Sequence, residues 1–564
     1  MRSKMLTVAI AAGLGLTSVT APVSAQSSNK KVTVSASELA QMKAEIQALE
    51  QKVQDLESQQ QAQQQAQVET AQSVQATQAQ VQATQKQVAA TTTMVQEHKG
   101  DILGGTGGVK WTFGGFLAAE TAYRSRDTAD DIATKFTAIP FMGGTSTAPI
   151  NTSSGATTTY PVTNARNNQF VYSARQSRLT IKAEGDINDS THVTGYYETD
   201  FLGGAQTANM NESNSFNMRI RQLWTNIDWN DYGLHALAGQ AWSLMTLDSV
   251  GITPGKEVLP PTIDAQYGAG FNWARQTQLR LVKDWDKKWW LGVSVENPQT
   301  AGIGATAGTG TKGYATTTAT VGAGSLYDTL NSVSLNQIPD ILVKFAADPG
   351  WGHYELFGIS REFTTRVTPT TANGGPGGTT NQTAHGGGFG FGMVLPLVPK
   401  VLDLQVSGMS GKGIGRYGTA GLNDITYTTS GAPHPLKENM ALGTLTWHAS
   451  DTFDLYVEGG REQQDSYQTV GVNGLPLGYG AAALGYNNAN CGIYGAATGC
   501  TGQNRAVSEQ TFGFFWKFYQ GKFGRVQFGT QFSHLSRQLF TDSKGNAPTA
   551  SDNMFFTSIR YYPF

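Results

Sequence analysis

Apolar and polar residues alternate one by one in many short segments of this chain after residue 108. In SRLTIKAEGD, Leu179, Ile181 and Ala183 alternate with charged or hydroxyl residues, and THVTGYYETDF repeats the pattern. A period of two gives a β-strand one apolar and one polar face. No stretch after residue 25 has the 18 apolar residues of a membrane helix, and only 15% of residues are charged. These features indicate a transmembrane β-barrel.

The connections between these segments alternate in length. Sixteen candidate strands begin near 110, 169, 192, 217, 233, 270, 288, 338, 351, 385, 401, 436, 452, 508, 523 and 552. Short turns alternate with long loops near 124–168, 202–216, 241–269, 298–337, 364–384, 411–435, 465–507 and 537–551. We therefore predict an all-β, 16-stranded antiparallel barrel over 109–564, with short periplasmic turns and long extracellular loops. A soluble β-sandwich would also alternate, but it is disfavoured because its charged inward-facing residues would be buried without partners.

The last segment, DNMFFTSIRYYPF, is rich in aromatic residues. We expect it to pair with the first strand and close the barrel, with Tyr562 and Phe564 in the interfacial aromatic girdle. Phe564 resembles the signal by which the barrel-assembly machinery recognises its clients. Strict alternation counted back from Phe564 would point Arg560 toward lipid. We therefore expect the alternation to break near Pro563, so that Arg560 points into the lumen. We also expect Phe555 and Ile559 to face lipid.

Residues 1–25 have the pattern of a secretory signal. Arg2 and Lys4 precede a short apolar run, and small residues lie before Gln26. The alternative is a single N-terminal membrane anchor, but the run is short and interrupted by glycine. The mature chain is therefore expected to be exported to an oxidising compartment.

Residues 26–108 are predicted to form a periplasmic stalk that ends in a Gly hinge. Every seventh residue from Leu39 to Val95 and from Met42 to Thr91 forms an a/d heptad series, although glutamines and threonines interrupt its apolar character. This pattern indicates a coiled coil, a rod of roughly 85 Å that would reach toward peptidoglycan. A disordered Gln/Ala-rich linker is the alternative. The heptads favour a dimer on the simple rule, but they do not fix the number of chains.

Two cysteines, Cys491 and Cys500, enclose a Gly-rich segment. In an oxidising compartment the pair predicts a disulfide, and a metal site would need more ligands than the segment offers. We predict no metal and no cofactor. The net charge of -2 favours no nucleic-acid partner.

The predicted lumen is rich in charge. Basic residues are expected on one wall, and acidic residues on neighbouring strands are expected to set up a transverse field that selects ions. The basic wall comprises Arg175, Arg178, Lys182, Arg219, Arg221, Arg275 and Arg280, and the acidic side comprises Glu184, Glu198 and Asp200. Guanidinium groups bind carboxylates bidentately, so the cluster favours anionic solutes. The alternative is that these arginines only brace the wall.

Three tryptophans have two interpretations. Trp224, Trp242 and Trp273 could stack on solute rings, but tryptophan is also the common residue of the interfacial girdle, and we favour the girdle.

Several motifs resemble the DcaP-like outer-membrane porins over essentially the whole mature chain. They are SRLTIKAEGDI, YYETDFLG, RIRQLWTNIDW, LAGQAWSLM, WARQTQLRL and the final YYPF. The resemblance implies a homotrimer of barrels assembled through the stalk and the barrel walls, and a preference for anionic compounds such as dicarboxylates. It places Arg178, Arg219, Arg221 and Arg275 in the basic wall. It also implies an inward third loop near 241–269, in which the constriction candidates are Asp248, Lys256, Glu257 and Asp264.

The sequence thus predicts an outer-membrane porin for small, anionic solutes, in contact with membrane lipid and lipopolysaccharide. A non-selective or cation-preferring porin with a tethering stalk is the alternative. An enzyme is disfavoured because no G-x-S-x-G or H-E-x-x-H motif is present, and a trimeric adhesin is disfavoured because the stalk precedes a full barrel.

Overall fold

The computed structural model describes residue 51 and residues 108–563, apart from 143–144, 150–156, 162–163, 204–215, 302–305, 308–313, 318, 322–331, 370–377, 472–473, 475, 494–499 and 501. The predicted signal, the heptad stalk other than Gln51, and the terminal Phe564 lie outside the described residues.

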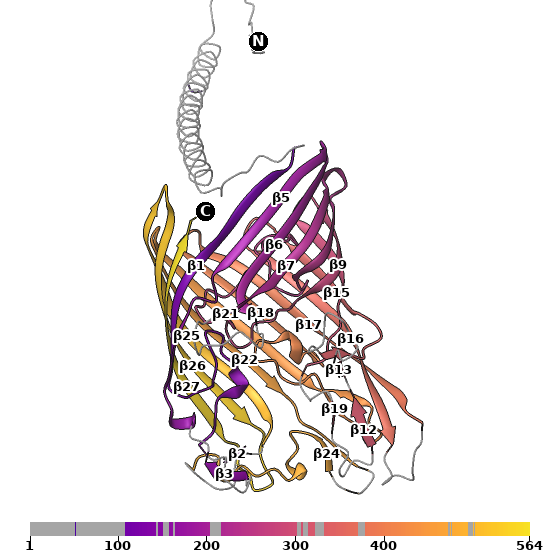
Figure 1. Cartoon of the computed structure of the whole chain (residues 1–564). Helices are drawn as coiled ribbons and strands as arrows, with labels where there is room; N and C mark the ends of the chain where they lie inside the picture. The colour runs from indigo at the N-terminus through magenta and orange to yellow at the C-terminus, as the bar shows by residue number, and fades with distance from the viewer. Residues whose placement is uncertain are drawn as a thin grey trace, which may run out of the picture. The chain divides into compact units, whose positions relative to one another are not determined.

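Sixteen antiparallel strands form a closed barrel, as predicted (Figure 1). Each strand pairs with the next along the chain, and the last pairs with the first. The strands are β1 (Lys110–Arg124), β5 (Arg178–Asn188), β6 (Thr191–Gly203), β7 (Asn217–Trp229), β8 (Leu234–Trp242), β9 (Arg275–Trp285), β10 (Trp289–Glu296), β15 (Asp340–Ala347), β16 (His353–Pro369), β17 (Thr380–Val398), β18 (Leu402–Lys412), β21 (Lys437–Ser450), β22 (Phe453–Gln464), β25 (Asn504–Gly521), β26 (Gly524–Leu539) and β27 (Thr549–Tyr562). A further short strand, β4 (Gln169–Ser173), precedes β5 in the chain. It pairs with residues 120–124 at the end of β1, whereas β5 pairs with residues 110–116.

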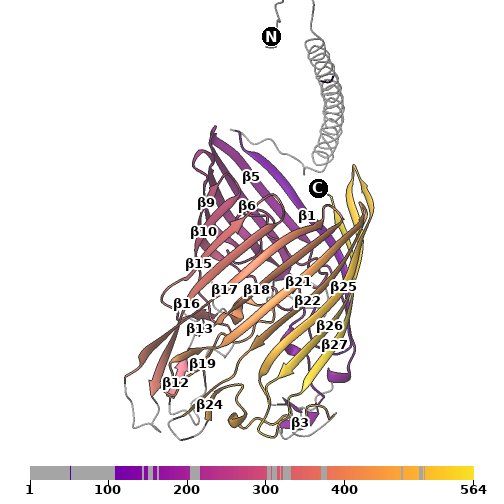
Figure 2. The same ribbon diagram turned by 180° about the vertical axis from the view of Figure 1, so that it is seen from behind.

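The long connections carry their own small elements, most of which lie toward one end of the barrel (Figures 1 and 2). The hairpins are β2 (Thr145–Pro149) with β3 (Thr157–Pro161), β11 (Thr306–Ala307) with β12 (Tyr314–Thr317), β13 (Ala319–Val321) with β14 (Ser332–Ser334), β19 (Ile425–Tyr427) with β20 (Pro433–Pro435), and β23 (Tyr467–Val470) with β24 (Pro476–Tyr479). Single 3-10 turns in these connections are η1 (Phe136–Ala138), η2 (Asn164–Arg166), η5 (Gly415–Tyr417) and η6 (Ala482–Leu484), and a further one, η3 (Asn230–Tyr232), lies in the short turn between β7 and β8.

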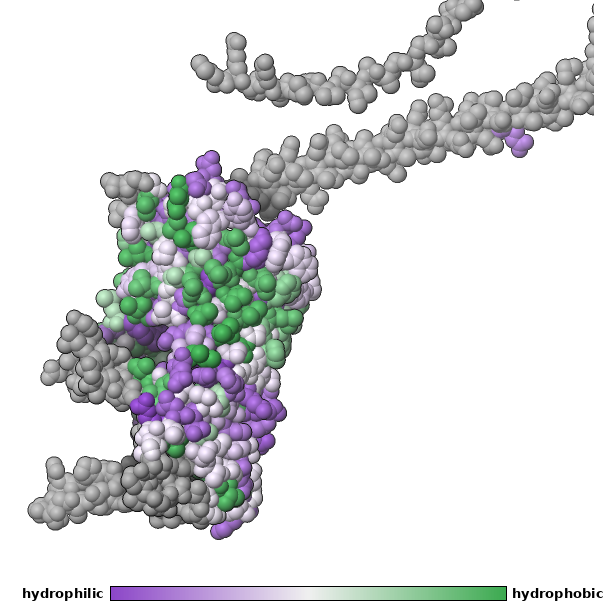
Figure 3. Space-filling view, turned by 90° about the vertical axis from the view of Figure 1, so that its right-hand side faces the viewer, coloured by the Kyte–Doolittle hydropathy of each residue, from purple (hydrophilic) through white to green (hydrophobic). Residues whose placement is uncertain are grey.

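The two faces of the barrel wall differ as the sequence alternation predicts. On β9, Leu279 and Leu281 are 54% and 59% exposed on the outer face, whereas Gln278 and Arg280 are buried on the inner face. Figure 3 shows apolar side chains gathered on one side of the barrel above a more hydrophilic region. Among the described residues, no helix is both long enough and apolar enough to span a membrane.

The closing strand turns Arg560 inward, as expected, and Phe555 and Ile559 outward. Arg560 donates from Nε and Nη2 to Oε1 of the buried Glu120 on β1, at 3.0 and 2.8 Å. The expectation for Tyr562 was wrong. Alternation runs unbroken along β27, so Tyr562 shares the inner face with Arg560. Its hydroxyl accepts a hydrogen bond from Gln527, and its ring packs 5.3 Å from that of Phe116.

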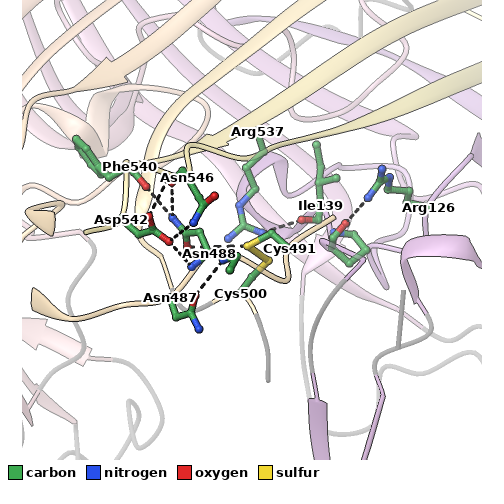
Figure 4. The surroundings of a disulfide bond; sticks show 12 residues. Arg126, Ile139, Asn487, Asn488, Cys491, Cys500, Arg537, Phe540, Asp542 and Asn546 are labelled. Carbon is green, nitrogen blue, oxygen red and sulfur yellow. Dashed lines mark hydrogen bonds between the residues drawn. A yellow bond between two sulfur atoms is a disulfide. The ribbon is translucent and has the colours of Figure 1, made fainter. Parts of the chain in front are cut away.

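Cys491 and Cys500 form the predicted disulfide (Figure 4). Cys491 is buried in a cluster with Ile132 and Phe136, which lie in the loop after β1. Nearby, Arg537 of β26 donates to the carbonyl of Ile139 at 2.7 Å. The disulfide therefore lies where the loop before β25 meets the loop after β1.

The contact between β27 and β1 gives a test of barrel stability. Glu120→Ala leaves Arg560 buried without its carboxylate, and breaking such a pair costs about 3–5 kcal/mol. We expect a lower urea midpoint for unfolding of the detergent-solubilised barrel. The double substitution to methionine at both positions should recover most of the loss. An E120A barrel as stable as the wild type would contradict this account.

Candidate functional site

The segment between β8 and β9, residues 243–274, folds into the barrel lumen; we call it the third loop. Its first half lies against β10, β15 and β16. The backbone N–H of Leu244 donates to Glu296 at 2.9 Å, and that of Asp248 donates to Glu355 at 3.0 Å. Both acceptors are buried carboxylates of the wall.

A buried ion cluster fixes this half of the third loop. Lys344 of β15 is fully buried, and its Nζ lies 2.7 Å from the Thr246 carbonyl, 3.0 Å from Asp248 Oδ2 and 2.9 Å from Glu355 Oε1. Asp248 therefore faces the wall rather than open lumen, and its backbone pairs with that of Glu257 in an isolated antiparallel β-bridge. We expected Asp248 to line a constriction, but the structure places it against Lys344, which neutralises it.

The third loop then crosses to the opposite wall. The N–H of Ile263 donates to Gln531 of β26 at 2.5 Å, and the N–H of Ala265 donates to the Ile132 carbonyl at 3.1 Å. On its return, Ala269 N–H donates to Glu509 at 3.0 Å and Gly270 N–H donates to Glu462 at 2.9 Å. Acceptors on at least four wall strands hold its backbone.

The segment between β18 and β21, residues 413–436, also folds inward, although we predicted an extracellular loop there. Ile414 and Tyr417 are fully buried. The Tyr417 carbonyl accepts a hydrogen bond from Trp273 N–H at 2.9 Å, so this segment packs against the third loop. Arg361 of β16 holds it through Asp424, at 2.9 Å.

Three hollows remain between the third loop and the wall formed by β1, β5, β6 and β7. Their volumes are about 400, 490 and 420 Å³ from the long-loop end to the short-turn end. The outer and central hollows share Leu202 and Ala265, and the central and inner hollows share Thr180 and Tyr196. The three hollows therefore adjoin one another along this wall.

The outer hollow is lined by Arg175, Arg219 and Arg275. Arg175 pairs with Asp131 at 2.8 Å. Arg275 has no carboxylate partner among the described residues. Its guanidinium lies over the rings of Trp242 and Trp273, 4.9 and 5.2 Å from their centroids, and its Nη1 is buried without a hydrogen-bond partner.

The central hollow is lined by Arg178, Arg221 and Arg560 together with Glu198 and Asp200. These groups pair across neighbouring strands rather than across the water. Arg221 Nη1 and Arg219 Nη2 lie 2.8 and 2.7 Å from Asp200 Oδ2, and Arg178 Nε lies 3.5 Å from Glu198. The predicted transverse field between opposed rows is therefore wrong for these residues, and the wall-bracing interpretation describes their contacts.

A β-bulge places Arg221. In the pairing of β6 with β7, Glu198 lies opposite Gln222 and Thr199 opposite Ile220, so Arg221 is the extra residue. Both Arg221 and Gln222 are consequently buried on the inner side. Bulges commonly re-aim side chains in this way.

The inner hollow is lined by Lys182, Glu184 and Lys256. Glu184 accepts from Lys110 at 2.8 Å and also pairs with Lys182. The Tyr196 ring stacks on that of Trp224 at 5.1 Å.

Two predicted residues and the tryptophans lie elsewhere than expected. Arg280 donates to Gln278 and to the Trp242 carbonyl, so it braces the start of the third loop and lines none of the three hollows. Glu257 also lines none of them. Trp224 and Trp242 are buried on the inner side, and the Trp273 ring meets that of Trp242 edge-on at 5.7 Å, so the girdle interpretation is wrong for all three.

The charges along the outer and central hollows nearly balance. Apart from Arg560, which Glu120 matches, the lining arginines are Arg175, Arg178, Arg219, Arg221 and Arg275, and the lining carboxylates are Asp130, Asp131, Glu198, Asp200 and Asp264. Asp264 of the third loop also lines the central hollow. Burial raises the pKa of the Asp264 carboxyl, an effect that Arg124 and hydrogen bonds only partly oppose, and this weakens its negative charge.

Lys344→Met tests the anchoring of the third loop. The variant leaves Asp248 beside Glu355 without the cation, and loss of such a buried pair costs about 3–5 kcal/mol. We expect faster hydrogen exchange at the backbone amides of 244–258, measured by mass spectrometry, with little change in the barrel strands. Lys288→Met, in an exposed turn, is the matched control. Unchanged protection in the Lys344 variant would show that the cluster does not hold the loop.

The chain matches no protein-family model and no curated protein. It is similar to the solved structure of the outer membrane channel DcaP of Acinetobacter baumannii, with a TM-score of 0.54 and 14% identity over 82% of this chain and 99% of that chain. It is also similar to the anion-selective porin from Comamonas acidovorans, with a TM-score of 0.40 and 11% identity over 80% and 99% of the two chains. For OprB of Pseudomonas putida the values are 0.43 and 10%, over 80% and 94%. The chain has a DcaP-like porin fold.

Proposed function

We propose that this protein is an outer-membrane porin, a water-filled channel for passive diffusion of small solutes that prefers anionic compounds such as carboxylates. The observation that carries the proposal is the row of three adjoining hollows beside β1, β5, β6 and β7, of which the outer and central hollows are lined by arginines. Each hollow is large enough to hold a small organic ion.

The preference for anions rests on Arg275, which lines the outer hollow, has no carboxylate partner among the described residues and keeps one buried nitrogen without a hydrogen-bond partner. A guanidinium fork matches a carboxylate bidentately. An anion in the outer hollow would lie beside Arg219 and Arg275, both of which line it.

A non-selective or cation-preferring porin is the second candidate. It is favoured by the direct pairing of Arg219 and Arg221 with Asp200, which lowers the positive potential at these residues. An enzyme is not favoured, because the protein whose fold this chain shares is described as a channel.

The N-terminal part of the proposal concerns assembly. Residues 1–25 would direct export, and the heptad stalk of 26–108 would hold three barrels together from the periplasm and would reach toward peptidoglycan. Phe564 would be recognised by the barrel-assembly machinery. The barrel would contact membrane lipid and lipopolysaccharide through its exposed apolar outer face.

The first experiment is the reversal potential of the purified protein in a planar bilayer under a KCl gradient. We expect anion selectivity, and we expect Arg275→Ala to lower the ratio of chloride to potassium permeability about two- to fivefold, because it removes a charge without a carboxylate partner. Arg366→Ala, on the exposed outer side of β16, is the control and should change nothing.

Cation selectivity of the wild type would overturn the proposed preference for anions but would not contradict the porin function. Absence of any conductance by the folded protein would overturn the porin itself.

Deletion of 26–100 tests the stalk. If the heptads assemble the protein, the deleted form should lose trimers on native gels or become more easily dissociated by heat, while its barrel still folds. Trimers of unchanged heat stability, together with unchanged envelope integrity, would contradict both the assembly and the tethering roles.

A further inference from the structure

Three cations lie on the outer face of the barrel toward the long-loop ends of β18, β21 and β22; two are opposed, and the third lies opposite Ala441, four residues along β21. They are Lys412, Lys437 and Arg461, and we call them the outer basic patch. All three are exposed. On β21, Met440 and Leu442 are buried toward the lumen, so Lys437 has the outward parity. Figure 2 shows the three strands side by side.

The patch contains a like-charged pair that the protein does not neutralise fully. Lys412 lies directly opposite Lys437 in the pairing of β18 with β21, and like charges in this position destabilise a sheet. Among the described residues, Lys412 has no carboxylate within salt-bridge distance. Lys437 pairs with Asp465 at 3.0 Å, but the side chains are 54% and 48% exposed, so the pair is screened by water.

Arg461 offers a second kind of contact. Its Nε and Nη2 both donate to Oε1 of Gln463, at 3.2 and 2.9 Å, which holds the guanidinium in place without cancelling its charge. Its Nη1 has no hydrogen-bond partner among the described residues. A guanidinium fork is well suited to phosphate oxygens.

The patch lies at a boundary on the outer face. Farther along β21 and β22 toward the short turns, the outward residues are apolar: Leu445, Trp447 and Val457 are 38%, 50% and 51% exposed. Between these residues and the lysines, Ser410 donates to Asn439 at 2.6 Å. The cations therefore begin where the apolar band of the barrel ends, which is the level of lipid headgroups in a membrane-spanning barrel.

We propose that the outer basic patch binds the phosphorylated headgroup of an outer-leaflet glycolipid, of the lipopolysaccharide type. Two phosphates would bridge the opposed lysines and the Arg461 fork, and the acyl chains would lie along the apolar band below. The inference rests on the proposed orientation, with the long loops outside, but not on transport or ion selectivity.

The test is native mass spectrometry of the detergent-solubilised full-length protein with bis-phosphorylated lipid A and with the same lipid after removal of its phosphates. We expect Lys412→Ser/Lys437→Ser/Arg461→Ser to bind the phosphorylated lipid about tenfold more weakly and the dephosphorylated lipid unchanged. The matched control is Lys288→Ser/Lys400→Asn/Lys522→Ser, which removes three exposed charges from short turns at the other end and should bind both lipids as the wild type does.

A single Arg461→Glu variant covers the case in which the triple variant folds poorly, and it should also bind the phosphorylated lipid more weakly. Three outcomes would overturn the proposal. They are equal binding by patch and control variants, equal loss of phosphorylated and dephosphorylated lipid, and no preference of the wild type for the phosphorylated form.

Discussion

The structure depends on the supply of hydrogen-bond acceptors to backbone that lies inside a closed barrel. Pairing of β1 with β27 satisfies the strands themselves. The third loop has no such ladder, yet it crosses the lumen, and a buried N–H without a partner is costly. Buried wall carboxylates supply the acceptors at Glu296, Glu355, Glu462 and Glu509. The wall is therefore acidic where the loop lies against it.

Close packing reinforces these bonds. Gly270 has a φ of +92°, and a Cβ there would collide with the carbonyl oxygen of Ala441 on β21. A Cβ on Gly460 of β22 would collide in the same way with the carbonyl oxygen of Ala269. Loop and wall thus approach backbone to backbone, which only glycine allows at both positions. The third loop is a fixed part of the lumen rather than a free strand of chain.

The sequence predicts the wall well and the lumen poorly, for a physical reason. Strand and lipid-facing residues follow a period of two, so all sixteen strands and the inward Arg560 could be found. The inward segment at 413–436 has no period, and its glycines and threonines look like any surface loop. The bulge at Arg221 interrupts the inward–outward alternation of side chains within β7. Lys344 in ILVKFAA was the one available signal, a lone cation on the inward face of an apolar strand.

These features together decide which charges meet water. The sequence places acidic residues around much of the inner wall, but Glu355, Glu462 and Glu509 are each at most 3% exposed, because the third loop and the segment at 413–436 cover them. The wall of β1, β5, β6 and β7 is not covered in this way, and the hollows with Arg178, Arg219 and Arg275 lie along it. The charges that line the hollows are therefore only part of those on the inner wall, because the inward loops cover Glu355, Glu462 and Glu509 and leave residues such as Arg178, Arg219, Asp200 and Asp264 to line the hollows.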